Sequence, residues 1–189
     1  MNRTTLVSAL VAGSTLVGAG YVLSRRPRHR ALASNIIPII TPVIDLRVAE
    51  DVLEALERVP GDEVTVVLHT LGGCVTSCVL IANALREFAA STAVVPYMAI
   101  SGGTLIALNA RKLQMGRSAA LSAVDPIVQG QRTKHLPEEP ADPQQALAHE
   151  YQAAITRYLR DTLVSRMPDI DEKRLWSTVD VFLGEHAPH

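Results

Sequence analysis

The sequence has few aromatic side chains, only two cysteines and almost no net charge. Aromatic residues make up 4% of the 189 residues and the formal net charge is −1, so nucleic acid is not expected as a partner. Cys74 and Cys78 are four residues apart and would share one face of a helix. No second cysteine pair completes a zinc-binding pattern. We therefore expect two small buried side chains rather than a redox or metal site, and neither a metal nor a cofactor.

Acidic residues are absent before Asp45, and the charges in that stretch are all basic: Arg3, Arg25, Arg26, Arg28 and Arg30. The rest of the chain holds 13 basic and 19 acidic residues. Charge of either sign is missing from Thr4 to Ser24, a run of 21 residues. About 20 helical residues cross the hydrocarbon core of a bilayer. This run predicts one transmembrane helix within an N-terminal segment, residues 1–30, that contacts membrane lipid.

The arginines around this span predict its orientation. Four of them follow the span and one precedes it, and positive flanks tend to stay on the cytoplasmic side. We expect Met1 outside and the remainder, residues 31–189, in the cytoplasm as one soluble domain. The alternatives are a cleaved signal peptide, whose charge should lie mainly before the apolar run, and a buried or interfacial helix.

The soluble part alternates between apolar runs of strand length and helical periodicity, with short connections. Proline within the first run indicates an edge strand. The uninterrupted apolar run at 64–69 predicts a sheet covered on both faces. This alternation is typical of an α/β fold with a mainly parallel sheet. Strands are expected at 36–40, 64–69, 93–97, 113–115 and 119–122, and helices at 46–59, 75–89, 104–110, 144–165 and 171–183.

Two glycine-containing turns each follow an expected strand. They are His69–Gly73, with the sequence HTLGG, and Ile100–Thr104, with the sequence ISGGT. Ligands bind at the carboxyl ends of parallel strands, so the turns should lie close together. A serine that begins a helix lies beside free backbone N–H groups, and acyl transfer needs a nucleophile and such donors. The alternatives are a plain turn or phosphate cradle at Gly72-Gly73 and a helix N-cap at Ser101.

Three motifs occur in order: HTLGG at 69–73, YMAISGGTLIALNA at 97–110 and LSAVDP at 121–126. On these motifs the chain, from 44 to about 130, resembles the serine dehydrogenase proteinase family. Members of that family are membrane-associated relatives of Clp protease and signal peptide peptidase A. The family pattern is roughly H-T-P-G-G, then A-M-S-G/A-G-T-x-I-A-L-A-A, then L-G-P-V-D-P.

The resemblance implies a Clp protease/crotonase-like α/β spiral that assembles into homo-oligomeric rings. It implies Ser101 as the nucleophile and the backbone N–H groups of Gly72 and Gly102 as the oxyanion hole, with Gly73 shaping the turn. Peptide or protein substrates would bind in extended form along the site.

The departures from the family pattern concern the turn and the general base. Leu71 replaces the family proline, which would loosen the turn, and Ser122-Ala123 replaces Gly-Pro. Val124 stands where Clp protease carries its catalytic histidine, so a triad of that type is not expected. Signal peptide peptidase relatives use a lysine base, whose pKa burial must lower from about 10.4. Lys134 is the candidate for this role, and a solvated loop lysine is the alternative.

Three further side chains are candidates near the site. His69 either orients the turn or is a polar residue with satisfied hydrogen bonds, and His135 is a second possible base. Asp125 either holds the backbone turn before Pro126 or orients the base. Lys112 is expected to face solvent.

The sequence therefore predicts a membrane-anchored serine peptidase that acts through an acyl-enzyme on Ser101. Family members continue beyond the region that resembles 184–189, so we expect a C-terminally shortened form. A non-catalytic membrane-anchored scaffold or peptide-binding protein is the first alternative. An acyl-CoA enzyme of the crotonase type is the second, disfavoured by Ser101 and by the lack of a basic CoA-binding patch.

Overall fold

The computed structural model describes residues 34–184, except 129–130, 133–136, 138 and 141. The chain separates into two units, 1–32 and 33–189, and every described residue belongs to the second. The expected transmembrane helix at 4–24 lies outside the described residues. Among the described helices, none combines the length and apolar character needed to span a bilayer.

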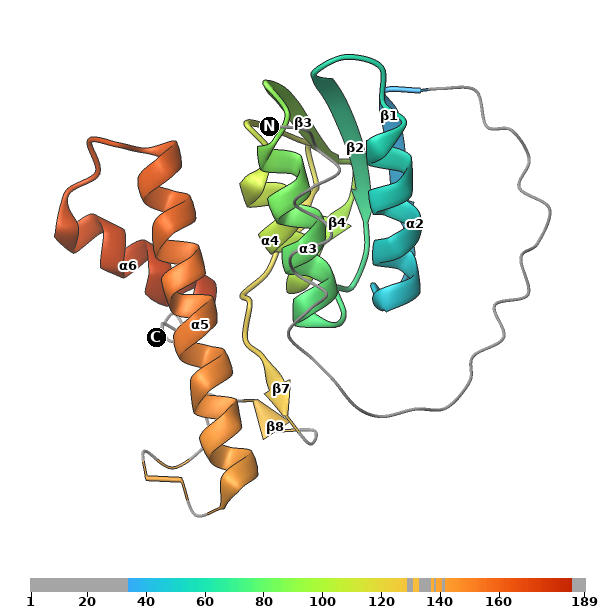
Figure 1. The fold of residues 1–189 in the computed structure, drawn as a ribbon. Helices are drawn as coiled ribbons and strands as arrows, with labels where there is room; N and C mark the ends of the chain where they lie inside the picture. Colours follow the sequence, from blue (N-terminus) through green and yellow to red (C-terminus); the bar gives the residue numbers. More distant parts are fainter. Residues whose placement is uncertain (1–33, 129–130, 133–136, 138, 141, 185–189) are drawn as a thin grey trace, which may run out of the picture. The chain divides into compact units, whose positions relative to one another are not determined.

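Four parallel strands form the main sheet in the order β1-β2-β3-β5. They are β1 (Ile36–Ile40), β2 (Glu63–His69), β3 (Ala90–Val95) and β5 (Lys112–Met115). β1 lies at one edge (Figure 1), as Pro38 predicted. Ile40 pairs with His69 where both strands end, so the carboxyl ends of β1 and β2 lie at the same edge of the sheet.

A second, two-stranded parallel sheet carries the chain past the end of β3. It pairs β4 (Met98–Ala99) with β6 (Ala120–Leu121). We had expected a single strand from 93 to 97, but the chain leaves the main sheet after Val95. Pro96 has no N–H group to donate to a neighbouring strand, which explains the break. β7 (Ile127–Val128) and β8 (Gln131–Arg132) form an antiparallel pair.

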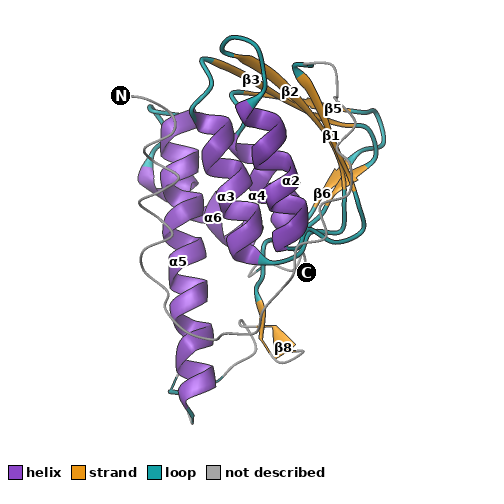
Figure 2. Ribbon diagram, turned by 45° about the vertical axis from the view of Figure 1, so that its right-hand side comes forward, coloured by secondary structure: helices purple, strands orange, loops and turns teal. Residues whose placement is uncertain are grey.

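Five helices lie on one side of the main sheet (Figure 2). Asp45, Asp142 and Asp171 cap three of them through side-chain oxygens that accept backbone N–H groups, as is common at helix N-termini. The helices are α2 (Leu46–Glu57), α3 (Val75–Arg86), α4 (Gly102–Asn109), α5 (Pro143–Arg166) and α6 (Glu172–Leu183).

In the described part of the chain, helices cover only one face of the main sheet. Val64, Val66 and Leu68 of β2 are fully buried beneath them, whereas Thr65 and Val67 on the opposite face are half-buried. Of the two faces for which cover was expected, the described helices therefore cover one. Valine is favoured in strands on either face, so an apolar run cannot show which face is covered.

α4 lies between two hydrophobic clusters, and all eight of its residues are buried. Ile106 and Ala107 belong to the cluster formed with the sheet, α2 and α3. Leu105 and Leu108 belong to a second cluster, formed with α5 and α6. The helix that follows Ser101 is therefore fixed from both sides.

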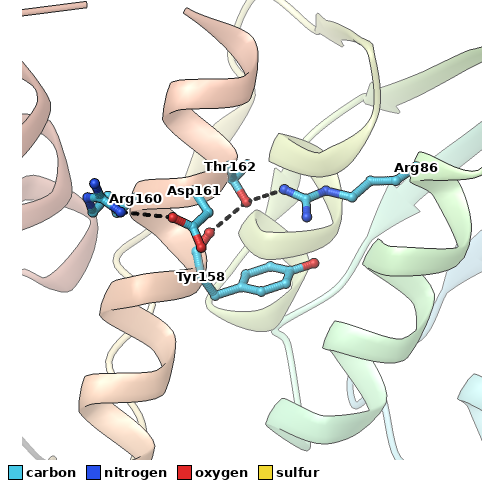
Figure 3. A network of polar contacts seen from close by, with 5 residues as sticks. All are labelled: Arg86, Tyr158, Arg160, Asp161 and Thr162. Atoms are coloured by element: carbon cyan, nitrogen blue, oxygen red, sulfur yellow. Dashed lines mark hydrogen bonds and ion pairs between the residues drawn. The ribbon is translucent and has the colours of Figure 1, made fainter. Parts of the chain in front are cut away.

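Polar contacts join α5 to α3 (Figure 3). The Arg86 guanidinium donates to the Thr162 hydroxyl at 3.0 Å and lies 5.3 Å from the centre of the Tyr158 ring. The Tyr158 hydroxyl donates to Asn83 at 2.8 Å. Burial, partly offset by the positive charge of Arg86, raises the pKa of Tyr158 to about 12, so its hydroxyl remains a donor at neutral pH.

Candidate active site

The two glycine-containing turns are in direct contact. A Cβ atom placed on Gly72 would lie 2.9 Å from the Ser101 Cβ and 2.9 Å from the Gly102 nitrogen. Thr70 joins the turns through its backbone, which accepts from the Ile100 N–H at 3.0 Å and donates to Met98. The expected proximity of the turns is therefore found, although Ser101 follows β4 rather than β3.

Ser101 has a backbone conformation that is rare for a residue with a side chain. Its φ of 51° is the only positive value for a non-glycine residue among those described. Such conformations cost about 1–3 kcal/mol and cluster at functional sites. Ser101 occupies the N-cap position of α4, but its half-buried side chain makes no capping hydrogen bond. The N-cap interpretation does not explain this hydroxyl, which stands at a sharp strand–turn–helix bend.

The backbone amides around this bend differ in what they contact. The Gly72 N–H donates to the Thr70 hydroxyl at 3.0 Å in a buried position. Gly102 begins α4, so its N–H has no acceptor within the helix. In the described part of the chain, the N–H groups of Gly73 and Gly102 have no hydrogen-bond acceptor. The free donors next to Ser101 are therefore at Gly73 and Gly102, whereas we had expected Gly72 and Gly102.

Gly73 fits its position because it has no side chain. Its φ is 157°, and a Cβ atom there would overlap the backbone of Ile44. Ile44 holds the turn by donating to the Gly72 carbonyl at 2.7 Å and accepting from the Cys74 N–H at 2.8 Å. The Leu71 N–H adds a bond to the Pro42 carbonyl at 3.2 Å. Proline at position 71 could not donate that bond, so the leucine helps to hold the turn that we had expected it to loosen.

The structure describes some of the positions considered for the general base and its support, but not others. Lys134 and His135 lie outside the described residues. The Val124 side chain is buried in the cluster with α5 and α6, so no base stands at that position. Asp125 is also buried, at 8% exposure, in the loop that follows β6.

His69 is at the last position of β2. Its ring contacts the Tyr97 ring edge-on, with 5.8 Å between the ring centres, and its buried Nδ1 atom has no hydrogen-bond partner among the described residues. Of the two alternatives for His69, the one in which its polar atoms all have hydrogen bonds is therefore not met at Nδ1. Its backbone carbonyl accepts from the Thr41 N–H at 3.1 Å, which connects the start of the HTLGG turn to the end of β1.

The two cysteines have opposite environments. Cys74 is the exposed N-cap of α3, while Cys78 is buried. The Ser77 backbone N–H lowers the pKa of the Cys74 thiol, whereas burial raises the pKa of Cys78 to about 12. The expectation of two buried side chains was wrong for Cys74, because α3 begins one residue after it. Among the described residues, no group of three His, Cys, Asp or Glu side chains is arranged to hold a metal ion.

Sequence comparison identifies the family. A family model described as ClpP-like SDH-type serine proteinase matches residues 20–137, more than half of the chain. The chain belongs to the ClpP-like SDH-type serine proteinases. Two proteins of Methanocaldococcus jannaschii, uncharacterized protein MJ0137 and uncharacterized protein MJ1495, are 44% identical to this chain over 85 residues and 37% identical over 109. These alignments cover 44% and 57% of the chain. The chain spans only 30% and 37% of the lengths of these relatives.

Solved structures show the same fold at low sequence identity. ClpP1 from Listeria monocytogenes has a TM-score of 0.56 and 15% identity, over 79% of each chain. A serine-to-alanine mutant of the 1510-N membrane-bound stomatin-specific protease has a TM-score of 0.58 and 14% identity. That match covers 80% of this chain and 70% of the other chain. The fold is therefore the α/β ClpP/crotonase-like one, with a parallel sheet.

Sequence reasoning missed three side chains that support the bend at Ser101. The Thr70 hydroxyl accepts the Gly72 N–H, the Ser122 hydroxyl accepts the Ser101 N–H, and Cys78 packs where a Cβ on Gly102 would be. Ser122 was visible as a departure from the family pattern. The sequence carried no signal for the contacts of Thr70 and Cys78, which depend on how the two turns pack.

Proposed function

We propose that this chain is a serine peptidase that cleaves peptide bonds through an acyl-enzyme on Ser101. The observation that supports it most is the bend at Ser101. A strained serine with an uncapped hydroxyl lies against a glycine turn, and two free backbone N–H groups flank it. This combination supplies a nucleophile and oxyanion donors, as acyl transfer requires.

In the proposed first step, the Ser101 Oγ attacks the carbonyl carbon of the scissile peptide bond and transfers its proton to a base. The N–H groups of Gly73 and Gly102 stabilise the resulting oxyanion. Collapse of this intermediate breaks the C–N bond, and the amine leaves with a proton from the base. Water then hydrolyses the ester and restores the hydroxyl. Gly72 supports this arrangement rather than donating, because its N–H is bonded to Thr70.

Lys134 is the proposed base, with Asp125 as the residue that orients it or holds the loop. Val124 is a buried core residue, so a histidine base at that position is absent. A lysine base must be neutral to accept a proton, and this requires desolvation. The test is Lys134→Met, which should abolish reaction at Ser101, compared with Lys112→Met on exposed β5, which should leave it unchanged.

Anchoring and assembly belong to the same proposal. The uncharged run at 4–24 and the four arginines after it support a single-pass membrane protein whose peptidase domain is cytoplasmic. Peptide or protein segments are the proposed substrates, bound in extended form, and homo-oligomers the proposed assembly. Fractionation of cells with carbonate washing, and protease accessibility of the peptidase domain in intact cells, would test the anchor and its orientation.

A non-catalytic peptide-binding protein with the same fold is the second candidate. The observation that favours it is Val124, which is apolar and buried where Clp proteases carry a catalytic histidine. On this hypothesis the strained bend binds a peptide carbonyl without attacking it.

A fluorophosphonate probe, which forms a covalent bond with activated serines, separates the two candidates. The full chain should be labelled at Ser101, and Ser101→Ala should lose the label while unfolding at the same temperature. Ser118→Ala, which removes an exposed serine, is the matched control and should be labelled normally. A folded full-length chain that the probe leaves unlabelled would support the binding protein instead. Turnover of acyl-CoA thioesters without peptide cleavage would favour the crotonase-type alternative.

A further inference from the structure

The backbone N–H of Ser101 has a specific acceptor. It donates to the Ser122 Oγ at 2.8 Å, and this hydroxyl in turn donates to the Ala123 carbonyl at 3.0 Å. Ser122 directly follows β6, which pairs with β4, the strand that leads into the bend. This hydrogen bond therefore connects the turn after β4, which contains Ser101, to the residue that directly follows β6.

Thr104 fixes Ser122 from the other side. Its hydroxyl is fully buried and lies 2.8 Å from the Ala99 carbonyl and 2.9 Å from the Ser122 carbonyl. The same oxygen accepts the Ser122 N–H at 3.2 Å. Thr104 is in the first turn of α4, so the end of β4, the start of α4 and the segment after β6 are tied together by two hydroxyl groups.

From this geometry we infer that Ser122 is a positioning residue that holds Ser101 in its positive-φ conformation. The inference rests on the proposed catalytic role of Ser101 and adds a residue to it. A positive φ costs free energy for a serine, and the hydrogen bond from its N–H to Ser122 offsets part of that cost. Because Ser122 takes the Ser101 N–H, the Gly102 N–H is left as the free donor on this side of the bend.

This contact is a property of this chain rather than of the family pattern. The pattern has glycine at the position of Ser122, and glycine has no side chain to accept the bond. Ser122, which the sequence showed only as a departure from that pattern, therefore adds a hydrogen bond to the backbone of Ser101. We expect it to make the bend stiffer and Ser101 more reactive.

The first test measures the labelling of the full chain by a fluorophosphonate at increasing probe concentration, which separates the maximal rate from the half-saturating concentration. Ser122→Ala and Ser122→Gly should lower the maximal rate about fivefold or more, the ratio that corresponds to one neutral hydrogen bond, with the half-saturating concentration unchanged. Ser122→Thr keeps the hydroxyl and should restore the rate to within about twofold. Ser118→Ala should behave as the parent.

These labelling outcomes are compared below the unfolding temperature of every variant, so that loss of fold does not contribute. A purely structural role would lower the unfolding temperature without changing the maximal rate of the folded protein. Equal maximal rates in the parent, Ser122→Ala and Ser122→Gly would overturn the inference, as would a Ser122→Thr variant as slow as the deletions.

A second test does not depend on catalysis. In the Ser101→Ala background, amide hydrogen exchange at residue 101 should be about fivefold faster or more when Ser122→Ala is added, whereas adding Ser118→Ala should not change it. If the parent is never labelled but this exchange accelerates, the proposed peptidase is wrong and the positioning contact stands. If labelling occurs and exchange is unchanged, the contact is wrong and the peptidase stands.

Discussion

At the scale of single residues, Gly73 and Gly61 offer a matched comparison, since both have positive φ values. A Cβ at Gly61 would meet nothing within 4 Å, whereas one at Gly73 would overlap the Ile44 backbone. We predict that Gly61→Ala costs about 1–2 kcal/mol of stability from its φ alone and leaves fluorophosphonate labelling unchanged. Gly73→Ala should cost more. Alanine keeps its backbone N–H, but the overlap with Ile44 should displace that N–H and reduce labelling of the folded protein by about 100-fold, the effect of losing one oxyanion donor.

Chemical denaturation and labelling rates, measured on the same preparations, test this pair. Equal labelling by the two variants at temperatures where both are folded would contradict the prediction that a side chain at position 73 displaces an oxyanion donor.

The two thiols should differ in their reaction with iodoacetamide, which attacks the thiolate. The Ser77 backbone N–H lowers the pKa of Cys74 below its usual value near 9, and burial raises that of Cys78 to about 12. A lowered pKa means that more thiolate is present as pH falls from 9 towards 7. We predict rapid modification of Cys74 at pH 7.5 and no modification of Cys78 until the protein is unfolded. Peptide mass spectrometry of Cys74→Ser and Cys78→Ser variants checks this, and preferential modification of Cys78 would contradict it.

At the scale of elements, the attachment of α5 can be measured by a double-mutant cycle. Arg86 on α3 and Thr162 on α5 are 3.0 Å apart, and Thr162 is buried. We predict a coupling free energy of about 1 kcal/mol between Arg86→Met and Thr162→Val, as for one hydrogen bond in a protected position. Urea denaturation of the parent, both single variants and the double variant gives this value.

The neighbouring pair Arg160–Asp161 serves as the control for this cycle. Its side chains are 49% and 65% exposed, and exposed ion pairs contribute little. Figure 3 shows both pairs: Arg160, Asp161 and Thr162 are on α5, and Arg86 reaches Thr162 from α3. A coupling as small for Arg86–Thr162 as for Arg160–Asp161 would mean that the hydrogen bond between Arg86 and Thr162 does not help to hold α5 in place.

At the scale of the whole molecule, the sequence predicted most of the fold because its signals were local. Pro38 marked the edge strand, and Asp45 preceded a helix that it does cap. The break after Val95 was missed because an apolar run extends across it. That the described helices cover one face of the sheet was missed because β-branched residues suit either face.

The candidate site was only partly predictable, for a different reason. Ser101 and the two glycine turns carry sequence signals, and the structure brings them together. Which glycine N–H is free depends on the Thr70 hydroxyl, and the support of Ser101 depends on a residue 21 positions away. Such contacts follow from the packing of α4 against both turns, which no local pattern encodes.

The burial of every residue in α4 limits how this protein can vary. A helix enclosed on all sides accepts few substitutions without creating a cavity or a clash, so mutation there would be removed by selection before it could adjust the chemistry. Substitutions that adjust the reactivity of Ser101 should instead occur in the short segments outside α4 that lie against the two turns. Diversity among descendants of this sequence is therefore expected to concentrate around positions 71 and 122, while the helix behind the serine stays constant.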